Sequence, residues 1–362
     1  MILIQNIYHM LAYAFQVLQR DHYRFQAEED FEHLDALYAA ILARAMADLL
    51  RRGLARNYIT LQEDLAAPHG RIDVPDTLKR QLLRRQRISC QYDAYSENIL
   101  WNQVLKATAM RLMRSPDVKA KTKEELKRVL GYLGTIDTIK LEDVRWDRLN
   151  LPKQYGLYSM LLAVCRMAVQ GKLPSTDANG KRRAAYADTQ AMSALYERFV
   201  RAYIAQRFPE LHVSAAYIGW ALEEDSDTSY LPAMRTDITV EGAKGKLIID
   251  TKFYAHAMQY HYDKATQHSG NLYQMLAYVD NAQAVTDLPV SGALLYARTD
   301  EAIAPDQRYI IRGKRIYVKT LNLNCEFKSI EAQICKLIAD SGILPFDKPA
   351  GGECSAGERS RK

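Results

Sequence analysis

The chain has 362 residues, of which 48% are hydrophobic and 25% charged, and this length and composition fit an ordinary soluble protein of two or three domains. The formal net charge of +6 is compatible with a nucleic-acid partner, although a generally basic surface accounts for it equally well. Five scattered cysteines without a Cys-x-x-Cys pair argue against a disulfide framework or a zinc site and favour a reducing compartment.

The first segment, residues 1–86, is expected to form an α+β domain. Its apolar N-terminus lacks the basic region and cleavage site of a signal peptide, and the chain contains no apolar run of about 18 residues. We therefore expect a cytoplasmic protein with no membrane partner. Apolar spacing predicts helices over 6–18 and 33–52, the second ended by Gly53, and then short strands around a turn at His69-Gly70.

The second segment, residues 87–185, is expected to be mostly helical. Ser96 is a candidate N-cap for its first helix, and two more helices are predicted over 121–136 and 153–171. The polar stretch from Pro174 to Thr189 contains Gly and Pro, which predicts a linker or an exposed loop.

The third segment, residues 186–346, alternates helices with strands and predicts a mixed α/β sheet packed by helices. The tail, residues 347–362, has the composition of a disordered segment. The predicted elements of the third segment are helices over 190–208, 270–285 and 329–340, a hairpin over 235–254, and strands over 290–299 and 308–323.

Charged residues lie inside the predicted hairpin, where apolar residues would be ordinary. If Gly242–Gly245 forms a four-residue loop, Asp237 faces Asp250, and Lys252 shares the face of Asp250 because strand side chains alternate. Opposed carboxylates repel each other, and burial makes this worse. A divalent cation between them removes the repulsion, and Mg²⁺ takes carboxylate, water and phosphate oxygens. Lys252 would then assist water attack on a phosphodiester.

A solvated hairpin face explains these residues about equally well if the hairpin is considered alone. In favour of a site, the second strand is apolar on both faces, as expected for a central strand, and buried acids there are unfavourable without a role. The order of residues along the chain adds to this. Glu197 lies in the helix before the hairpin, and Gln274 and Tyr278 lie four residues apart on the helix after it, so they share a face.

This order, E…D…DxK…QxxxY, resembles the PD-(D/E)xK nuclease superfamily in the branch with a downstream QxxxY helix. Thr236 replaces the proline of the name. The resemblance implies a restriction-endonuclease-like mixed α/β (α+β) sheet flanked by helices and a Mg²⁺-dependent endodeoxyribonuclease, with Mn²⁺ as the alternative ion. The implied catalytic residues are Asp237, Asp250, Lys252, Glu197, Gln274 and Tyr278. The implied metal ligands are Asp237, Asp250, Thr251 and Glu197, and the expected DNA-binding residues are Lys244, Lys246, Tyr254, Gln274 and Tyr278.

The chain also resembles the McrC family, the nuclease subunits of 5-methylcytosine-specific restriction systems. The motifs NIYHMLAYAF, HGRID, NIL, LPAMRTDI, DTKFY and NLYQMLAY occur in the family's order, from about residue 5 to 345. The resemblance implies a McrB-like AAA+ GTPase hexamer as partner, engaged by residues 1–86, with Arg71 and Asp73 as interface candidates. It also implies methylated double-stranded DNA as substrate and a self-dimer that bridges two rings. Because the chain lacks a G-x-x-x-x-G-K-[ST] phosphate loop, we expect it to bind no nucleotide itself.

Basic residues near the hairpin, Lys244 and Lys246, are expected to lie beside the acids and to follow a phosphate backbone. Two other functions stay open. One is a non-catalytic adaptor that binds and stimulates an AAA+ motor. The other is a stand-alone Cas4/RecB-like nuclease, although the cysteine spacing does not support the iron–sulfur cluster that such nucleases often carry.

Overall fold

The computed structural model describes residues 2–15, 31–149, 151–152, 154–170, 190–253, 259–261, 264–266, 268–298 and 304–344. The chain divides into two compact units. We call His33–Val169 the helical unit, and Met1–Glu32 with Gln170–Lys362 the sheet unit. The predicted linker 174–189 and tail 347–362 lie outside the described residues. No helix in the described ranges is both long and apolar enough to cross a membrane.

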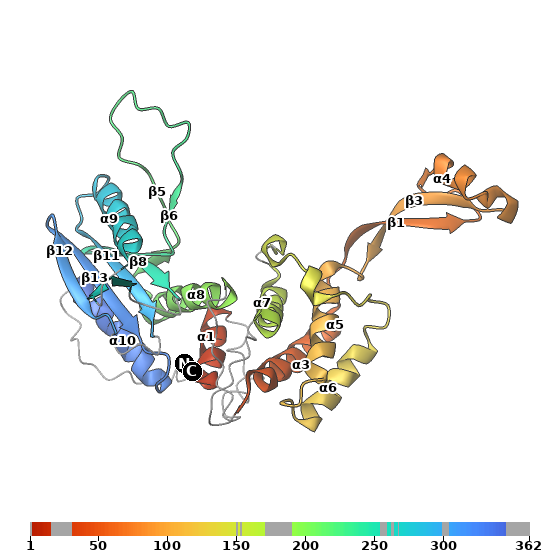
Figure 1. Ribbon diagram of the computed structural model, residues 1–362, viewed down its shortest axis with the longest axis horizontal. Helices are drawn as coiled ribbons and strands as arrows, with labels where there is room; N and C mark the ends of the chain where they lie inside the picture. The colour runs from red at the N-terminus through yellow and green to blue at the C-terminus, as the bar shows by residue number, and fades with distance from the viewer. Residues whose placement is uncertain are drawn as a thin grey trace, which may run out of the picture. The chain divides into compact units, whose positions relative to one another are not determined.

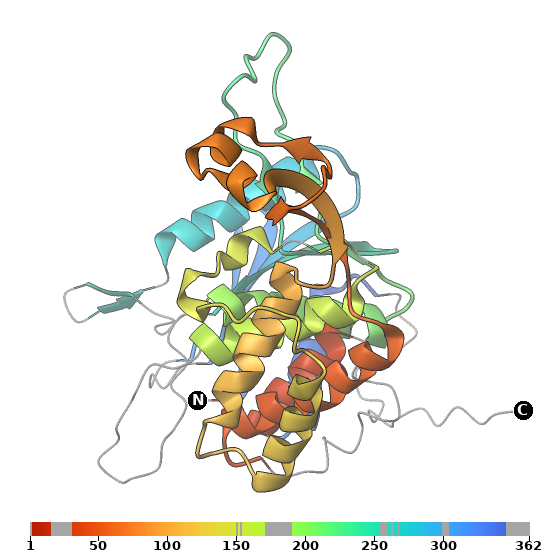
Figure 2. The ribbon, with the colours of Figure 1, turned by 90° about the vertical axis from the view of Figure 1, so that its right-hand side faces the viewer.

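The helical unit combines a helix cluster with a protruding β arm (Figure 1 and Figure 2). Helices α3, α5 and α6 pack against one another. Tyr158 of α7 joins them, because its hydroxyl donates to Asn102 Oδ1 and accepts from the Ala55 amide at the root of the arm. The helices are α3 (Leu34–Arg52), α4 (Val74–Lys79), α5 (Leu100–Met113), α6 (Ala120–Gly131) and α7 (Gly156–Gln170), with 3₁₀ turns η3 (Leu82–Arg85), η4 (Leu141–Asp143) and η5 (Trp146–Arg148).

The arm is a three-stranded antiparallel sheet in the order β1-β3-β2, made of β1 (Asn57–Leu65), β2 (Arg71–Ile72) and β3 (Ile88–Ser96). Strands were predicted around His69-Gly70, and Gly70 does take a positive φ of 66°. A Cβ there would lie 2.5 Å from the Gln91 carbonyl oxygen, so the turn requires glycine. Elements α4 and η3 lie at the far end of the arm from the helices (Figure 1).

Two expectations for this unit are wrong. The predicted boundary at residue 86 cuts through the arm, because β3 pairs with both β1 and β2. Ser96 does not cap a helix: it ends β3, its Oγ accepts from the Asn98 amide, and α5 begins at Leu100. By contrast, Gly53 ends α3 as predicted, with a φ of 89°.

The sheet unit is built on a six-stranded mixed sheet in the order β12-β13-β11-β8-β7-β4. The inner pairs β13–β11 and β11–β8 are parallel, and the other pairs are antiparallel. The predicted mixed α/β sheet with packed helices is therefore confirmed. The strands are β4 (His212–Ser214), β5 (Tyr217–Ile218), β6 (Met234–Arg235), β7 (Ile238–Gly242), β8 (Gly245–Lys252), β9 (Gln259–His261), β10 (Lys264–Thr266), β11 (Val290–Ala297), β12 (Gln307–Ile311) and β13 (Lys314–Leu321).

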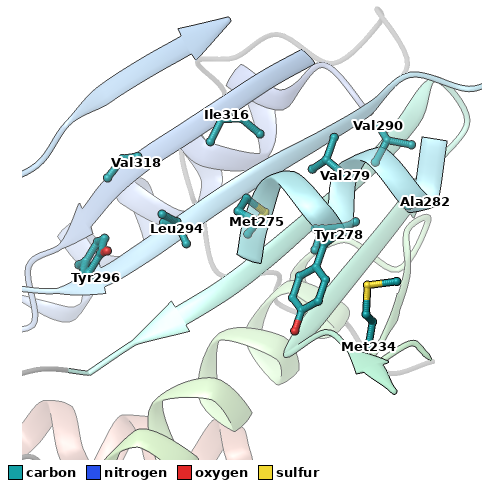
Figure 3. Close-up of a cluster of buried hydrophobic side chains, with 11 residues drawn as sticks. Met234, Met275, Tyr278, Val279, Ala282, Val290, Leu294, Tyr296, Ile316 and Val318 are labelled. Carbon is teal, nitrogen blue, oxygen red and sulfur yellow. The ribbon is translucent and has the colours of Figure 1, made fainter. Parts of the chain in front are cut away.

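Helices cover both faces of this sheet (Figure 1). Helix α9 (Ser269–Gln283) packs Met275 and Val279 onto β8, β11 and β13 (Figure 3). Its close approach requires Gly292 on β11, because a Cβ there would lie 2.4 Å from Met275 Sδ. On β13, Ile316 and Val318 belong to the cluster under α9, whereas Tyr317 donates to the Asp340 carbonyl of α10 (Phe327–Ser341). Because side chains alternate along a strand, α9 and α10 cover opposite faces.

Helix α1 (Ile4–Ala14) belongs to the sheet unit, although it is far from that unit in sequence. It packs against α8 (Gln190–Arg207) through Tyr13, whose ring contacts those of Phe199 and Tyr203. Asn6 Nδ2 also donates to the Leu323 carbonyl oxygen at 2.8 Å. The prediction that residues 1–86 form one domain therefore differs from the structure, because the first helix completes the core of the C-terminal unit.

Candidate functional site

The β7–β8 hairpin has the predicted register. Glu241 pairs with Lys246, and Gly242 pairs with Gly245, so the connection has two residues, Ala243 and Lys244, rather than the four assumed from sequence. Asp237 lies one residue before β7, at the position that would next face Asp250 in this register. The hairpin therefore brings Asp237 to the end of β8 that carries Asp250 and Lys252.

Asp250 and Lys252 form a buried ion pair. Asp250 is 3% exposed, and its Oδ2 lies 2.7 Å from Lys252 Nζ. The ammonium therefore offsets part of the cost of burying this carboxylate. The remaining cost of a buried charge would be reduced further by a bound cation.

Asp237 is oriented by its neighbour on the adjacent strand. The amide and the hydroxyl of Thr251 both donate to Asp237 Oδ2, at 2.8 and 2.9 Å. Thr236, at the position of the superfamily's proline, is buried. Its amide donates to the Ala216 carbonyl oxygen at 3.0 Å, a hydrogen bond that proline could not make. Threonine at this position therefore fixes the backbone just before the acid.

A chain of hydrogen bonds connects the lysine to α9. Lys252 Nζ donates to Gln274 Oε1 at 3.3 Å, and Gln274 Nε2 donates to the Tyr278 hydroxyl at 2.8 Å. The Tyr278 hydroxyl in turn donates to the Arg235 carbonyl oxygen at 3.1 Å. Tyr278 belongs to the apolar cluster under α9 (Figure 3), so burial of its ring fixes the position of its hydroxyl. The predicted Gln/Tyr pair thus holds Lys252 and the strand that leads to Asp237.

Glu197 on α8 reaches the site together with Arg201, which its sequence position alone did not single out. Arg201 Nη1 lies 2.7 Å from Glu197 Oε1 and donates to the Asp237 carbonyl oxygen at 3.2 Å. The available signal was the spacing of four residues, which places Arg201 beside Glu197 on one helix face. Arg201 therefore links the helix acid to the backbone of the hairpin acid.

The three acids influence one another electrostatically. Burial raises the pKa of Asp250 to about 6, against the attraction of Lys252 and with further contributions from Asp237 and Glu197. Burial, followed by repulsion from Asp237, also raises the pKa of Glu197. Nevertheless, no three His, Cys, Asp or Glu side chains within the described ranges are grouped closely enough to hold a metal ion together. A cation at this site would meet two carboxylates and complete its coordination with other oxygens.

The expectation that Lys244 and Lys246 lie beside the acids is wrong. They occupy the turn end of the hairpin, whereas Asp250 lies towards the other end of β8. At about 3.3 Å per residue, Lys246 is about 13 Å along the strand from Asp250. Lys246 Nζ instead lies 2.7 Å from Glu241 Oε1 on the paired strand. Tyr254, the remaining DNA-binding candidate, lies outside the described residues.

The predicted partner-interface residues lie in the arm of the helical unit. Arg71 is exposed on β2. Asp73 caps α4, because its Oδ1 accepts from the Asp76 amide at 3.0 Å. This cap gives Asp73 a structural role that is independent of any partner.

Comparison with known proteins identifies the family. A model of the family described as "McrBC 5-methylcytosine restriction system component" matches residues 5–297. The chain belongs to this family. This membership confirms the resemblance found in the sequence, and the matched range includes the N-terminal helix, the arm and the whole candidate site.

Relatives of this family member include the type IV methyl-directed restriction enzyme EcoKMcrBC of Escherichia coli (strain K12). It is 27% identical over 335 residues, which cover 91% of this chain and 95% of that protein. A chain of the half-complex from the tetradecameric assembly of Thermococcus gammatolerans McrB AAA+ hexamers with bound McrC matches 93% of this chain and 76% of its own length, with a TM-score of 0.45 and 12% identity. A chain of the Thermococcus gammatolerans McrBC complex matches 56% of this chain and 58% of its own length, with a TM-score of 0.39 and 15% identity.

Proposed function

We propose that this chain is the DNA endonuclease subunit of a McrBC-like, modification-dependent restriction system, and that it also stimulates a partner AAA+ GTPase. One observation carries the nuclease proposal. In a chain of this family, the buried Asp250–Lys252 pair lies at the end of the hairpin that carries Asp237. Two acids and a lysine in this arrangement suit metal-dependent hydrolysis of a phosphodiester.

The side chains fit a Mg²⁺ ion, with Mn²⁺ as a substitute. Asp237 and Asp250 would hold it. Burial and repulsion from Asp237 raise the pKa of Asp250, and a cation between the two carboxylates would offset both effects, which supports this assignment. Because both donor groups of Thr251 bind Asp237, Thr251 serves to orient that carboxylate. When bound, Mg²⁺ supplies Lewis-acid activation of water and neutralises phosphate charge.

Lys252 would act as an ammonium group held between Asp250 and Gln274. From there it can donate a hydrogen bond to a phosphate oxygen, where negative charge develops during cleavage. Gln274 and Tyr278 would keep the ammonium in place through their hydrogen bonds, and their α9 surface would lie against DNA. The positioned lysine matters because a donor that is already oriented needs no rearrangement when the phosphate reacts.

The arm of the helical unit is the proposed contact with the GTPase partner. Its far end exposes apolar side chains, with Leu78 60% and Leu83 58% exposed, next to the basic residues Lys79, Arg84 and Arg85. Exposed apolar side chains that cluster together mark interaction sites. Arg71 and Asp73 lie in the same arm. The ring-shaped GTPase itself is an expectation from the family.

The test is cleavage of methylated and unmethylated plasmid in Mg²⁺ by the purified chain, with and without the GTPase encoded beside it, and with and without GTP. Asp250→Ala is the matched inactive variant. The proposal expects cleavage only with methylated DNA, GTP, partner and Asp250 together. Cleavage by the chain alone would favour a stand-alone nuclease. Stimulated GTP hydrolysis without any cleavage would favour the adaptor.

A further inference from the structure

Arg201 is a second cation at the candidate site, besides Lys252. Its Nη1 makes two contacts, at 2.7 Å to Glu197 Oε1 and at 3.2 Å to the Asp237 carbonyl oxygen. The side chains of Arg201 and Glu197 are about one-third exposed, 30% and 32%. The proposed metal chemistry of this site does not use Arg201.

The contact to Asp237 makes this ion pair more than a surface pair. Helical pairs four residues apart are usually weak, because two long side chains must be ordered in solvent. Here the backbone carbonyl of Asp237 gives the guanidinium a second contact besides Glu197. Glu197 therefore meets a cation that the backbone also holds, and a hydrogen bond between two charged groups is a strong one.

The three acids of the site are held by different groups. Asp250 Oδ2 lies 2.7 Å from Lys252 Nζ, and Asp237 Oδ2 accepts both hydrogen bonds of Thr251. Glu197 Oε1 has a short bond to Arg201. No group of three acidic or other metal-ligating side chains is found among the described residues. Adjacent strands bring Asp237 and Asp250 together, whereas the guanidinium of Arg201 holds Glu197 on α8.

We propose that the site binds a single divalent cation through Asp237 and Asp250, and that Arg201 is the positioning residue that keeps Glu197 out of its coordination. This inference rests on the proposed nuclease function, and it differs from the expectation that Glu197 is a metal ligand. Removing the guanidinium would release Glu197 next to Asp237. Two carboxylates are enough to recruit a second cation, since Mg²⁺ and Mn²⁺ fill the remaining positions with water.

The test counts Mn²⁺ ions bound by the full chain, from the loss of the free-ion signal in electron paramagnetic resonance. We expect about one tightly bound Mn²⁺ for the wild type and about two for Arg201→Met, whose side chain has similar length and no charge. Adding Glu197→Gln to Arg201→Met should restore a count of one. Arg201→Lys should behave as the wild type, because a single nitrogen makes both contacts. Arg201→Gln is the alternative neutral variant if Arg201→Met does not fold.

The Mn²⁺ counts can contradict the single-cation proposal in two ways. Two ions on the wild type would overturn the proposal, and so would a count of one on both neutral variants while they retain the wild-type circular dichroism spectrum. Asp250→Ala separates this inference from the proposed function. If that variant still binds Mn²⁺ as the wild type does, the metal site itself is wrong, whatever Arg201 does.

Discussion

Replacing Asp250 with Asn should stabilise the metal-free sheet unit, although Asp250 is central to the proposed chemistry. Burial raises the pKa of this carboxyl from 3.8 to about 6, so its ionised form is disfavoured in the folded chain. A shift of about two units corresponds to about 3 kcal/mol, since one unit is about 1.4 kcal/mol. This figure already includes the attraction of Lys252, which lowers the same pKa. Asn has a similar shape but no charge to bury.

The pH dependence gives the prediction its sign. Below pH 3.8 the carboxyl is protonated in both the folded and the unfolded chain, so Asp250 carries no penalty. As the pH rises from 3.8 to about 6 the unfolded chain ionises first, and stability is lost until the full penalty is reached. Asp250→Asn should thus exceed the wild type by about 3 kcal/mol at about pH 7.5, and by about half of that at about pH 5.

The assay is urea unfolding in excess chelator, followed by tryptophan fluorescence. The chain has three tryptophans, and Trp220 lies in the sheet unit, so Trp101→Phe and Trp146→Phe make its signal specific to that unit. Adding Mg²⁺ should stabilise the wild type but not Asp250→Asn, because only the folded wild type binds the ion. A variant that is less stable than the wild type at about pH 7.5 would refute the reasoning.

Three further changes have expected outcomes. Lys252→Ala should lose cleavage while its Mn²⁺ binding stays within a few-fold of wild type, as measured by single-turnover cleavage and paramagnetic titration. Gly292→Ala should destabilise the sheet unit by about 1–3 kcal/mol in urea, because its Cβ would collide with α9. The double variant Leu78→Asp and Leu83→Asp should abolish stimulation of GTP hydrolysis. Tyr132→Asp is the control, because Tyr132 is exposed on the same unit but lies outside the arm, and this variant should stimulate GTP hydrolysis as the wild type does.

The hairpin was predictable because its constraints are local. Alternation along a strand places Lys252 on the face of Asp250, and the glycines of the turn set the register that brings Asp237 to the same end. The predicted loop of four residues was too long by two, because Gly242 and Gly245 form a further strand pair. This difference does not matter for the site, because adding a pair at the turn leaves every other pair unchanged.

Longer-range packing was not readable from the sequence. The apolar spacing of α1 predicts a helix with one buried face but does not identify the unit on which that face packs. Its position on α8 depends on contacts of the Tyr13 ring with Phe199 and Tyr203, which are distant in sequence. The partnership of β3 with β1 depends on a return of the chain after α4 and η3. Lys244 and Lys246 look close to the acids in sequence, but an extended strand separates them.

One measurement tests the central claim most directly: the single-turnover rate at which Asp250→Asn, with its GTPase partner and GTP, linearises a methylated plasmid in Mg²⁺. The urea titration above establishes whether this variant is folded. The proposed site predicts no linear product in the time that the wild type needs to convert all the plasmid. Removing a group that stabilises transition-state charge typically lowers the rate by about 10²–10³-fold. Cleavage by a folded Asp250→Asn at more than about a tenth of the wild-type rate would therefore contradict the proposed site.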